Sequence, residues 1–475
     1  MPPRTPRQAP QPTQPAQSGL RRAIGQRLNR WFATGGFTAR MVLAMLIPVV
    51  ISQGFIIGFG ALGPMLVSGA GIEAISAVST VEYINAVTLG TFVSVAAAGS
   101  VLVAQCAGKG DTKQMTRAGA ATLWSAAAPA ALVGGALVAF HRPLLDALVG
   151  PAGQAVVDHA RVYLIAAAAS YPAHALVEAA SAAMRGVGHT RPTLFLTVTM
   201  NGGTLLLAAG LIYGAHLAVA GLAISLVVSR YLAAGLALWW YKHDTRLGVG
   251  VKTGRPDLAM IGRVFHICVP FVLENLFFNG GKLVIQFFVV SLGTGQITIN
   301  AVGQGLISLC EMAPQAMIIG IVPLVGQAIG AGRPREARRV ILSFITASVV
   351  VSCAVTVVVL AAFPWLLNLY HTPSDLRGDV MKVFLLAALG RVTFLWAMSY
   401  ILPSGLRAAG DAVYSTIVAT GAMAFRVAGA WFMAVHLGYG TVGVWVAMVV
   451  EWGLRSALYG ARLLSGRWEH KSFVA

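Results

Sequence analysis

Long apolar runs, bounded by glycine, proline or charged residues, dominate the chain. Runs of at least ~18 residues, long enough for a helix to cross the apolar core of a bilayer, recur from residue 41 to about residue 462. Their boundaries predict helical spans at residues 41–66, 73–106, 115–139, 155–183, 190–213, 216–240, 260–291, 296–328, 337–363, 380–404, 411–434 and 440–462. The predicted fold class is an all-α integral membrane protein with twelve transmembrane helices.

Two loops in this pattern carry the same motif at a fixed spacing. A V-x-Q element precedes a glycine-rich turn in VLVAQCAGKGD (101–111) and again in PLVGQAIGAGRPREA (323–337), with Gln105 and Gln327 222 residues apart. The same offset links Pro48 to Pro270, Gly71 to Gly293, Gly108 to Gly330, Gly110 to Gly332, Arg117 to Arg339, Arg185 to Arg407, Gly188 to Gly410 and Gly221 to Gly443. This constant register predicts an internal repeat of two six-helix lobes. The lobes are residues 41–240 and 260–462, joined by a cytoplasmic linker at 241–259.

Phosphate binding is the alternative interpretation of these loops, because glycine-rich turns beside basic residues can cradle phosphate. Neither copy continues to G-K-[ST] or completes G-x-G-x-x-G, and neither follows a predicted strand. We therefore interpret both loops as helix ends that are turned by glycine and anchored by basic residues at the membrane surface.

Composition and charge agree with the membrane interpretation. Of the 475 residues, 57% are hydrophobic and only 11% are charged, too few to cover a water-soluble surface. The net charge of +18 would indicate nucleic acid in a soluble protein, but no such partner is predicted here. With an inside N-terminus, 26 of the 34 Lys and Arg residues fall on cytoplasmic segments or span ends, against four on outer ones. This bias predicts cytoplasmic termini and parallel lobes.

The segments outside the spans are basic. Residues 1–40 form a cytoplasmic tail, whose first 19 residues are rich in Pro and Gln and are predicted to be disordered. Residues 20–31 fit either a short amphipathic helix on an anionic inner leaflet or a solvated lead-in. Residues 463–475 form a cytoplasmic C-terminal tail. The four cysteines lie at no metal-ligand spacing and are interpreted as small buried hydrophobic residues.

Three further motifs join the two V-x-Q loops: AMRGVGHTRP (183–192), GLRAAGD (405–411) and GTVGVWVA (440–447). Over residues of about 41–465, the chain resembles the multidrug and toxic compound extrusion (MATE) transporters. The resemblance implies export of organic compounds, commonly amphiphilic cations, in exchange for H⁺ or Na⁺, with no other cofactor. It also implies a location in the cell inner (cytoplasmic) membrane. The chain departs from many members because its first span and its tenth span, RVTFLWAMSYILPSGLR, contain no acid. Ion-binding carboxylates cannot be transferred to those positions.

Ionisable side chains inside the spans are the candidates for ion coupling, because each costs at least ~2.5 kcal/mol to insert. The acids are Glu82, Glu178, Glu274, Glu311 and Glu451, and the bases are Arg230, Lys282, Arg391 and Arg426. Five charged residues inside the second lobe have no charged counterpart in the first lobe at the 222-residue offset: Glu274, Lys282, Glu311, Arg391 and Arg426. This asymmetry predicts that coupling resides in the C-terminal lobe.

Glu274 is the first candidate. It lies four residues after Pro270, whose missing N–H loosens the local helix. Its carboxylate could carry a proton, or hold Na⁺ with added oxygen ligands. The alternative is a structural partner for a base such as Arg391 or Arg426. Glu311 and Glu82 are the next ion-coupling candidates.

Two other acids are interpreted as structural. Glu178 lies near a cytoplasmic span end, where pairing with Arg185 is the simpler role. Glu451 has Arg455 one helical turn on, which favours a pair within one helix.

Polar and aromatic residues predict a permissive substrate cleft between the lobes. The predicted lining residues are Gln53, Tyr83, Asn85, Asn201, Asn275, Phe278, Arg391, Trp396 and Tyr400. For each aromatic residue taken alone, helix packing is the commoner role. The bases of the second lobe leave the charge of the substrate open.

The predicted function is secondary active export of small organic, amphiphilic compounds by antiport with H⁺ or Na⁺. The two lobes would alternate access to the cleft, and we expect a monomer surrounded by membrane lipid. The related alternative is a flippase or exporter of an anionic or lipid-linked substrate. An enzyme is not predicted because we find no H-E-x-x-H motif, no paired acids at helical spacing at a membrane interface and no Ser–His–Asp grouping. A channel is disfavoured because no ring of filter residues is evident.

Overall fold

The computed structural model describes residues 38–68, 71–149, 153–247 and 257–473. The predictions for residues 1–37, including the amphipathic helix at 20–31, lie outside these ranges. The first bundle contains α2 (Ala39–Ser68), α3 (Ile72–Lys109), α4 (Thr112–Ala139), α5 (His141–Val149), α6 (Gln154–Gly186), α7 (Arg191–Thr197), η2 (Val198–Gly202), α8 (Gly203–Ala209), η3 (Gly210–Gly214) and α9 (Ala218–His243). The second contains α10 (Leu258–Ser291), α11 (Thr294–Gly330), α12 (Pro334–Ala361), α13 (Phe363–Leu369), α14 (Arg377–Val392), α15 (Leu395–Ala409), α16 (Ala412–Trp431), η4 (Phe432–His436) and α17 (Gly440–Leu464).

Ten helices in the described part of the chain are long and apolar enough to cross a membrane, and eleven if the bent pair α14 and α15 counts as one span. The predicted span at 155–183 forms the long helix α6, which is not among them. The outward-facing residues include large apolar side chains such as Leu132, Leu206 and Val357, which are 75%, 79% and 66% exposed. An apolar exterior of this kind is suited to lipid and not to water.

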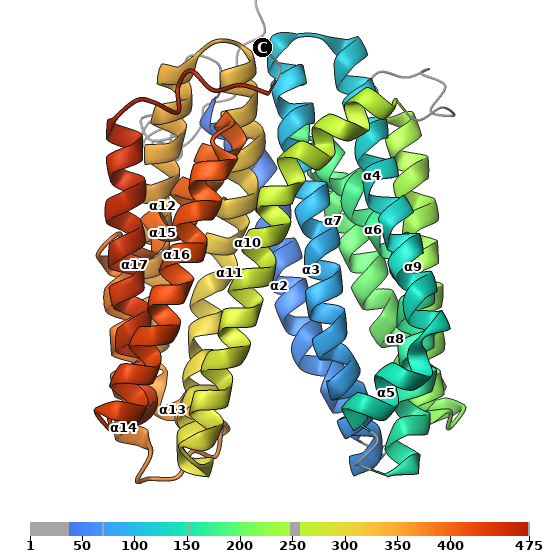
Figure 1. The fold of residues 1–475 in the computed structure, drawn as a ribbon, viewed down its shortest axis with the longest axis vertical. Coiled ribbons are helices and arrows are strands. Elements are labelled where there is room, and N and C mark those ends of the chain that lie inside the picture. Colours follow the sequence, from blue (N-terminus) through green and yellow to red (C-terminus); the bar gives the residue numbers. More distant parts are fainter. Residues whose placement is uncertain (1–37, 69–70, 150–152, 248–256, 474–475) are drawn as a thin grey trace, which may run out of the picture.

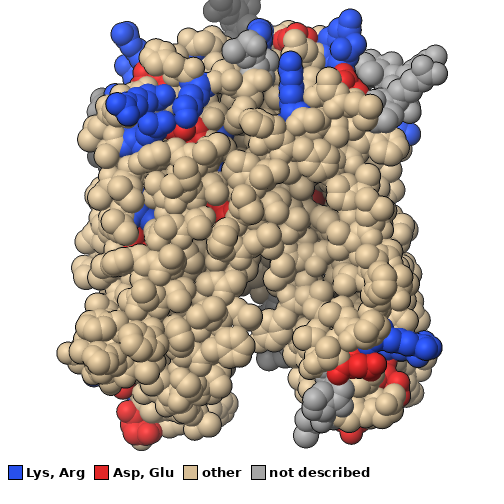
Figure 2. All heavy atoms as spheres, viewed as in Figure 1, with Lys and Arg blue, Asp and Glu red and all other residues tan. Residues whose placement is uncertain are grey.

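The helices gather into an N-terminal and a C-terminal bundle that diverge toward one end (Figure 1). We call this end, which carries α5 and α13, the open end. The opposite end carries the α3–α4 and α11–α12 turns and the end of α17, and we call it the basic end. Figure 2 shows Lys and Arg gathered there and a hollow between the bundles that widens toward the open end.

The two bundles share local irregularities at the 222-residue offset. The π-helical turns η3 (210–214) and η4 (432–436) occupy equivalent positions. Each turn is packed closely against a glycine in the helix that follows it. A Cβ on Gly221 would lie 3.1 Å from Leu211 Cβ, and one on Gly443 would lie 2.8 Å from the carbonyl carbon of Met433. These equivalences support the predicted repeat.

The predicted span at 380–404 is not one straight helix. It divides into α14 and α15, which meet at an angle of 51°. Phe394 lies at the break with a positive φ of 66°, a conformation that ends a right-handed helix. Its carbonyl then accepts the amide N–H of Met398 at 2.9 Å and starts α15.

Candidate functional site

The leading coupling candidate, Glu274 on α10, forms an ion pair with Arg407 on α15. Arg407 Nη1 lies 2.6 Å from each of the two carboxylate oxygens of Glu274. The two side chains are only 16% and 18% exposed. Arg407 also donates from Nη2 to Ser404 Oγ at 2.9 Å, and its guanidinium lies 5.4 Å from the centroid of the Phe271 ring. The base that pairs with Glu274 is therefore neither Arg391 nor Arg426, the two named in the alternative interpretation, because Arg407 reaches Glu274 from the end of α15.

Glu311 on α11 has a different base. Its Oε1 accepts a 2.7 Å hydrogen bond from Nη2 of Arg391 on α14. Arg391 is only 1% exposed, whereas Glu311 is 25% exposed. The guanidinium lies 5.8 and 5.5 Å from the rings of Trp396 and Trp452. A pair this buried stabilises the helix packing only as long as both charges are present.

An aromatic cluster surrounds a third pair, Glu451 and Arg455, in the C-terminal bundle. The pair spans one turn of α17 at 3.2 Å and is 1% and 3% exposed, which confirms the predicted structural pairing. Arg455 lies 4.8 Å from the ring centroid of Tyr400. Tyr400 in turn stacks on Trp396, with centroids 5.0 Å apart, and meets the edge of Phe278 at 6.4 Å.

Two further bases of this bundle have no acidic partner within 4.0 Å among the described residues. Lys282 Nζ lies 4.6 Å over the Phe278 ring. Arg426 is 8% exposed, and its Nε has no hydrogen-bond partner in the described chain. The C-terminal bundle thus carries more positive than negative charge in its interior.

A polar network in the N-terminal bundle connects α3 with α6. Glu82 Oε1 accepts hydrogen bonds from Asn85 Nδ2 at 2.9 Å and from the Tyr163 hydroxyl at 2.5 Å. Asn85 Oδ1 accepts from the Tyr171 hydroxyl at 2.7 Å. Asn85 and Tyr171 are buried, while Glu82 is exposed. The network therefore connects an exposed carboxylate to buried polar side chains by hydrogen bonds.

Replacing Tyr163 with phenylalanine is expected to destabilise the protein by about 1–2 kcal/mol, because Glu82 loses a charge-assisted hydrogen bond from a buried donor. The midpoint of thermal unfolding in detergent measures this effect. Tyr231→Phe is the matched control, since its exposed hydroxyl donates only to the carbonyl of Ala169. Equal midpoints for the two variants would contradict the prediction.

The repeated glutamines close the basic end by reciprocal hydrogen bonds between the bundles. Gln105 Nε2 donates to the carbonyl of Ala408 at 2.8 Å, and Gln327 Nε2 donates to the carbonyl of Gly186 at 2.9 Å. Donors and acceptors are each 222 residues apart. The V-x-Q motif thus has a structural role at the junction, in agreement with the rejection of a nucleotide site.

The glycines of the same motif allow the closest approach at this junction. A Cβ on Gly108 would overlap the backbone carbonyl of Gln327, and one on Gly330 would overlap that of Gln105. Helices α3 and α11 therefore meet backbone to backbone. Only glycine fits at these two positions while the basic end is closed.

The C-terminal segment (residues 465–473) folds back onto this junction. The backbone N–H of Phe473 donates to Gln105 Oε1 at 2.9 Å. Lys471 Nζ lies 2.6 Å from Oδ1 of the fully buried Asp411. Trp468 is also completely buried. The segment is thus part of the packed fold at the basic end.

Replacing Trp468 with alanine is expected to cost about 3 kcal/mol, because it removes a fully buried aromatic side chain. The thermal unfolding midpoint of the purified protein should fall by several degrees. Trp365→Ala is the control, because Trp365 is 65% exposed and should leave the midpoint unchanged. A C-terminal segment that does not dock would give the same midpoint for both variants.

A known family accounts for most of the chain. The MatE family matches residues 48–213 and 270–432, which are two blocks that lie in the two bundles. This chain belongs to the MatE family. Its members are transporters and not enzymes.

Individual relatives of the MatE family are distant in sequence but similar in fold. The chain is 22% identical over 331 residues to the uncharacterized transporter YisQ of Bacillus subtilis, covering 67% of this chain and 71% of that protein. It is 23% identical over 385 residues to the probable multidrug resistance protein NorM of Thermotoga maritima, covering 79% and 81%. A solved structure described as the outward-facing conformation of a multidrug resistance MATE family transporter has a TM-score of 0.81 at 16% identity, covering 91% of this chain and 96% of that one. The predicted family and the all-helical membrane fold are confirmed.

The predicted cleft residues of this MatE protein fall into separate places. Phe278, Arg391, Trp396 and Tyr400 come together in the C-terminal bundle, where Arg391 and Trp396 are buried. Asn85 joins the Glu82 network, and the neighbouring Tyr83 is 65% exposed. Asn275 lies between the bundles, because a Cβ on Gly90 of α3 would be 2.8 Å from its Oδ1. Gln53 on α2 and Asn201 on η2 are half-buried, and Asn201 Nδ2 donates to the carbonyl of Thr197 within its own helix.

Two hydrogen-bond partners of the candidate acids were not predicted from the sequence: Arg407 for Glu274 and Tyr163 for Glu82. The sequence assigned Arg407 to a cytoplasmic span end and predicted no acidic partner for it. Its repeat counterpart, Arg185, lies 3.9 Å from Glu178, as the sequence predicted. Because Arg407 is equivalent to Arg185, the predicted Glu178–Arg185 pair indicated that Arg407 could also form an ion pair with an acid. Tyr163 was not considered, although it lies eight residues before Tyr171 and so shares a face of α6 with it.

Proposed function

We propose that this MatE protein is a secondary active exporter of small organic compounds, driven by antiport with H⁺ or Na⁺. The observation that carries the proposal is the closure of one end only. Reciprocal glutamine bonds and glycine contacts join the bundles at the basic end, while the hollow widens toward the other end (Figure 2). Opening the basic end and closing the other would move a bound compound across the membrane.

Glu274 is the proposed coupling residue. Both of its carboxylate oxygens are engaged by Arg407, so a proton or a Na⁺ ion has to compete with this base. Neutralising Glu274 would release Arg407 and weaken the contact between α10 and α15. Ion binding would thereby favour one arrangement of these helices over the other, which is the requirement for coupling. Glu311 and Glu82 stay as secondary candidates.

A second candidate function is export of an anionic compound. It is favoured by Lys282 and Arg426, which have no acidic partner within 4.0 Å in the described chain. Two such bases, one of them Lys282 beside the Phe278 ring, are suited to a ligand with a negatively charged group and an apolar body.

The proposed location is the cell inner membrane, with the basic end in the cytoplasm. The support is the positive-inside rule, because Lys and Arg gather at that end (Figure 2). The hollow of this structure then faces outward. The transporter is proposed to act as a monomer.

The deciding experiment is transport by purified protein in lipid vesicles. Efflux of a fluorescent organic cation is measured under an imposed pH gradient and, separately, a Na⁺ gradient. We expect one gradient to drive efflux, Glu274→Gln to abolish it, and Glu73→Gln, at an exposed position at the start of α3, to retain it. Folded protein that moves a fluorescent anion instead supports the second candidate. Folded protein that moves neither compound contradicts both.

A further inference from the structure

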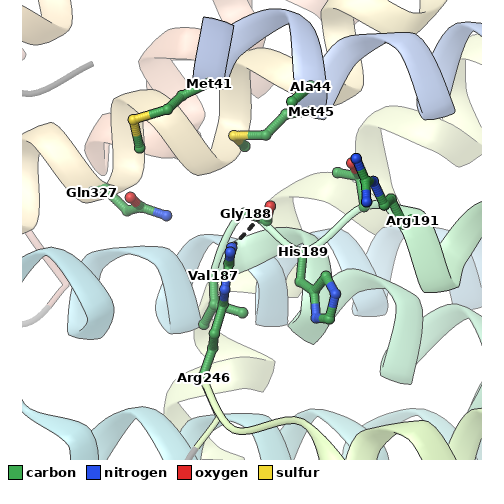
Figure 3. Close-up of a pocket in the computed structure, with 10 residues that line it drawn as sticks. Met41, Ala44, Met45, Val187, Gly188, His189, Arg191, Arg246 and Gln327 are labelled. Carbon is green, nitrogen blue, oxygen red and sulfur yellow. Dashed lines mark hydrogen bonds between the residues drawn. The ribbon is translucent and has the colours of Figure 1, made fainter. Parts of the chain in front are cut away.

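A cavity of about 360 Å³ opens at the basic end, beside the junction between the bundles. The start of α2, the loop between α6 and α7, and Arg246 after α9 form its walls, and Gln327 of α11 completes it (Figure 3). A ligand in this cavity would therefore contact both bundles. No part of the transport proposal uses it.

The cavity is positively charged. Arg191 and Arg246 line it, and neither forms an ion pair within the described chain. The nearby acid, Asp244, is 5% exposed and already engaged. Its Oδ1 accepts the backbone N–H of Arg246 at 2.9 Å, and its Oδ2 lies 2.7 Å from His189 Nδ1. Two guanidinium groups are thus left to face the cavity without a counter-charge.

The equivalent place in the other bundle is filled by the protein itself. At the 222-residue offset, Gln327 and Gly188 of the cavity correspond to Gln105 and Gly410. Phe473 donates to Gln105 Oε1, and a Cβ on Gly410 would lie 3.1 Å from the backbone of Lys471. In the described part of the chain, nothing donates in this way to the side-chain oxygen of Gln327. One of two related sites is therefore occupied by a peptide and the other is open.

The two longest stretches outside the described ranges contain no acidic side chain that could pair with these arginines. Residues 1–37 and 248–256 contain no Asp or Glu. An added basic segment would increase the repulsion with Arg191 and Arg246. Arg191 and Arg246 are both exposed, so an anionic ligand can reach them and supply the counter-charge.

We propose that this cavity binds the phosphate group of an anionic phospholipid. Arg191 and Arg246 offer planar groups that can hold phosphate oxygens in bidentate fashion. The opposite wall is apolar, with Met41 and Met45 of α2, and suits the start of the acyl region (Figure 3). Helices α2 and α7 begin at this level, as expected where a span meets the headgroups. The bound lipid bridges the N-terminal bundle to Gln327 and holds the basic end closed.

The test is retention of lipid by the purified protein, measured by native mass spectrometry. The protein is exchanged into detergent with phosphatidylglycerol or, in parallel, phosphatidylcholine. We expect retained phosphatidylglycerol but not phosphatidylcholine, and at least a tenfold loss in the double variant Arg191→Gln/Arg246→Gln. The control Arg335→Gln/Arg339→Gln removes two exposed charges at the same end and should retain the lipid.

A second variant tests the cavity without changing charge. Ala44 is exposed at the cavity wall, and Ala44→Trp would fill the space. We expect it to lose phosphatidylglycerol as the double arginine variant does. Equal retention by wild type, Ala44→Trp and the arginine variant would overturn the proposal. The proposal would also be overturned if inorganic phosphate raised the thermal unfolding midpoint of the protein while no lipid was retained. The site would then belong to a soluble phosphate compound.

Discussion

Replacing Arg407 with glutamine is expected to destabilise the protein by about 3–5 kcal/mol and to abolish ion-driven efflux. The variant leaves Glu274, only 16% exposed, without the base that contacts both of its oxygens. Removing one partner of a buried ion pair costs this much because the remaining charge is desolvated and unpaired. Thermal unfolding and size-exclusion profiles in detergent measure the loss of stability.

The double variant Glu274→Gln/Arg407→Gln separates the structural role of the pair from its role in coupling. Two neutral amides can hydrogen-bond to each other, so most of the lost stability should return. Coupling should not return, because no carboxylate is left to take up H⁺ or Na⁺. A double variant that is stable and still driven by the same gradient would exclude Glu274 as the coupling residue. A single Arg407→Gln variant as stable as wild type would show that the pair is well solvated.

Helix positions could be predicted from the sequence because the spans are long and their ends are marked. The predicted spans at 260–291 and 296–328 correspond closely to α10 (Leu258–Ser291) and α11 (Thr294–Gly330). Glycine marks the turn between them, with Gly293 at a φ of 99°. The bend at Phe394 could not be predicted in this way, since the apolar pattern continues through it and no glycine or proline marks the break.

Ion-pair partners were less predictable than helices. Pairs within one helix, such as Glu451 with Arg455, follow from spacing alone. Glu274 and Arg407 are 133 residues apart, and their contact depends on where the fold places α10 and α15 relative to each other. The sequence therefore identified Glu274 as a candidate but not its base. The internal repeat was a better guide to contacts between the bundles. It identified Gln105 and Gln327, which form the reciprocal hydrogen bonds of the junction.

The junction itself gives the second large expected effect. Gly108→Ala is expected to open the basic end, because the added Cβ would overlap the carbonyl of Gln327. Overpacking of this kind costs about 1–3 kcal/mol. If the clash exists only when the basic end is closed, it shifts the balance between the two states by about 5- to 150-fold. Gly330→Ala should act in the same direction, since its Cβ would overlap the carbonyl of Gln105.

Spin labels at the open end can measure this shift. Cysteines that replace Asp146 on α5 and Trp365 on α13 lie on exposed positions of the two bundles. In a background with Cys353 replaced by serine, electron–electron distances should shorten in Gly108→Ala as the open end closes. Gly135→Ala is the control, because no atom lies within 4 Å of its added Cβ. An unchanged distance distribution in both glycine variants would mean that the bundles do not separate at the V-x-Q loops, and alternating access would then need a different hinge.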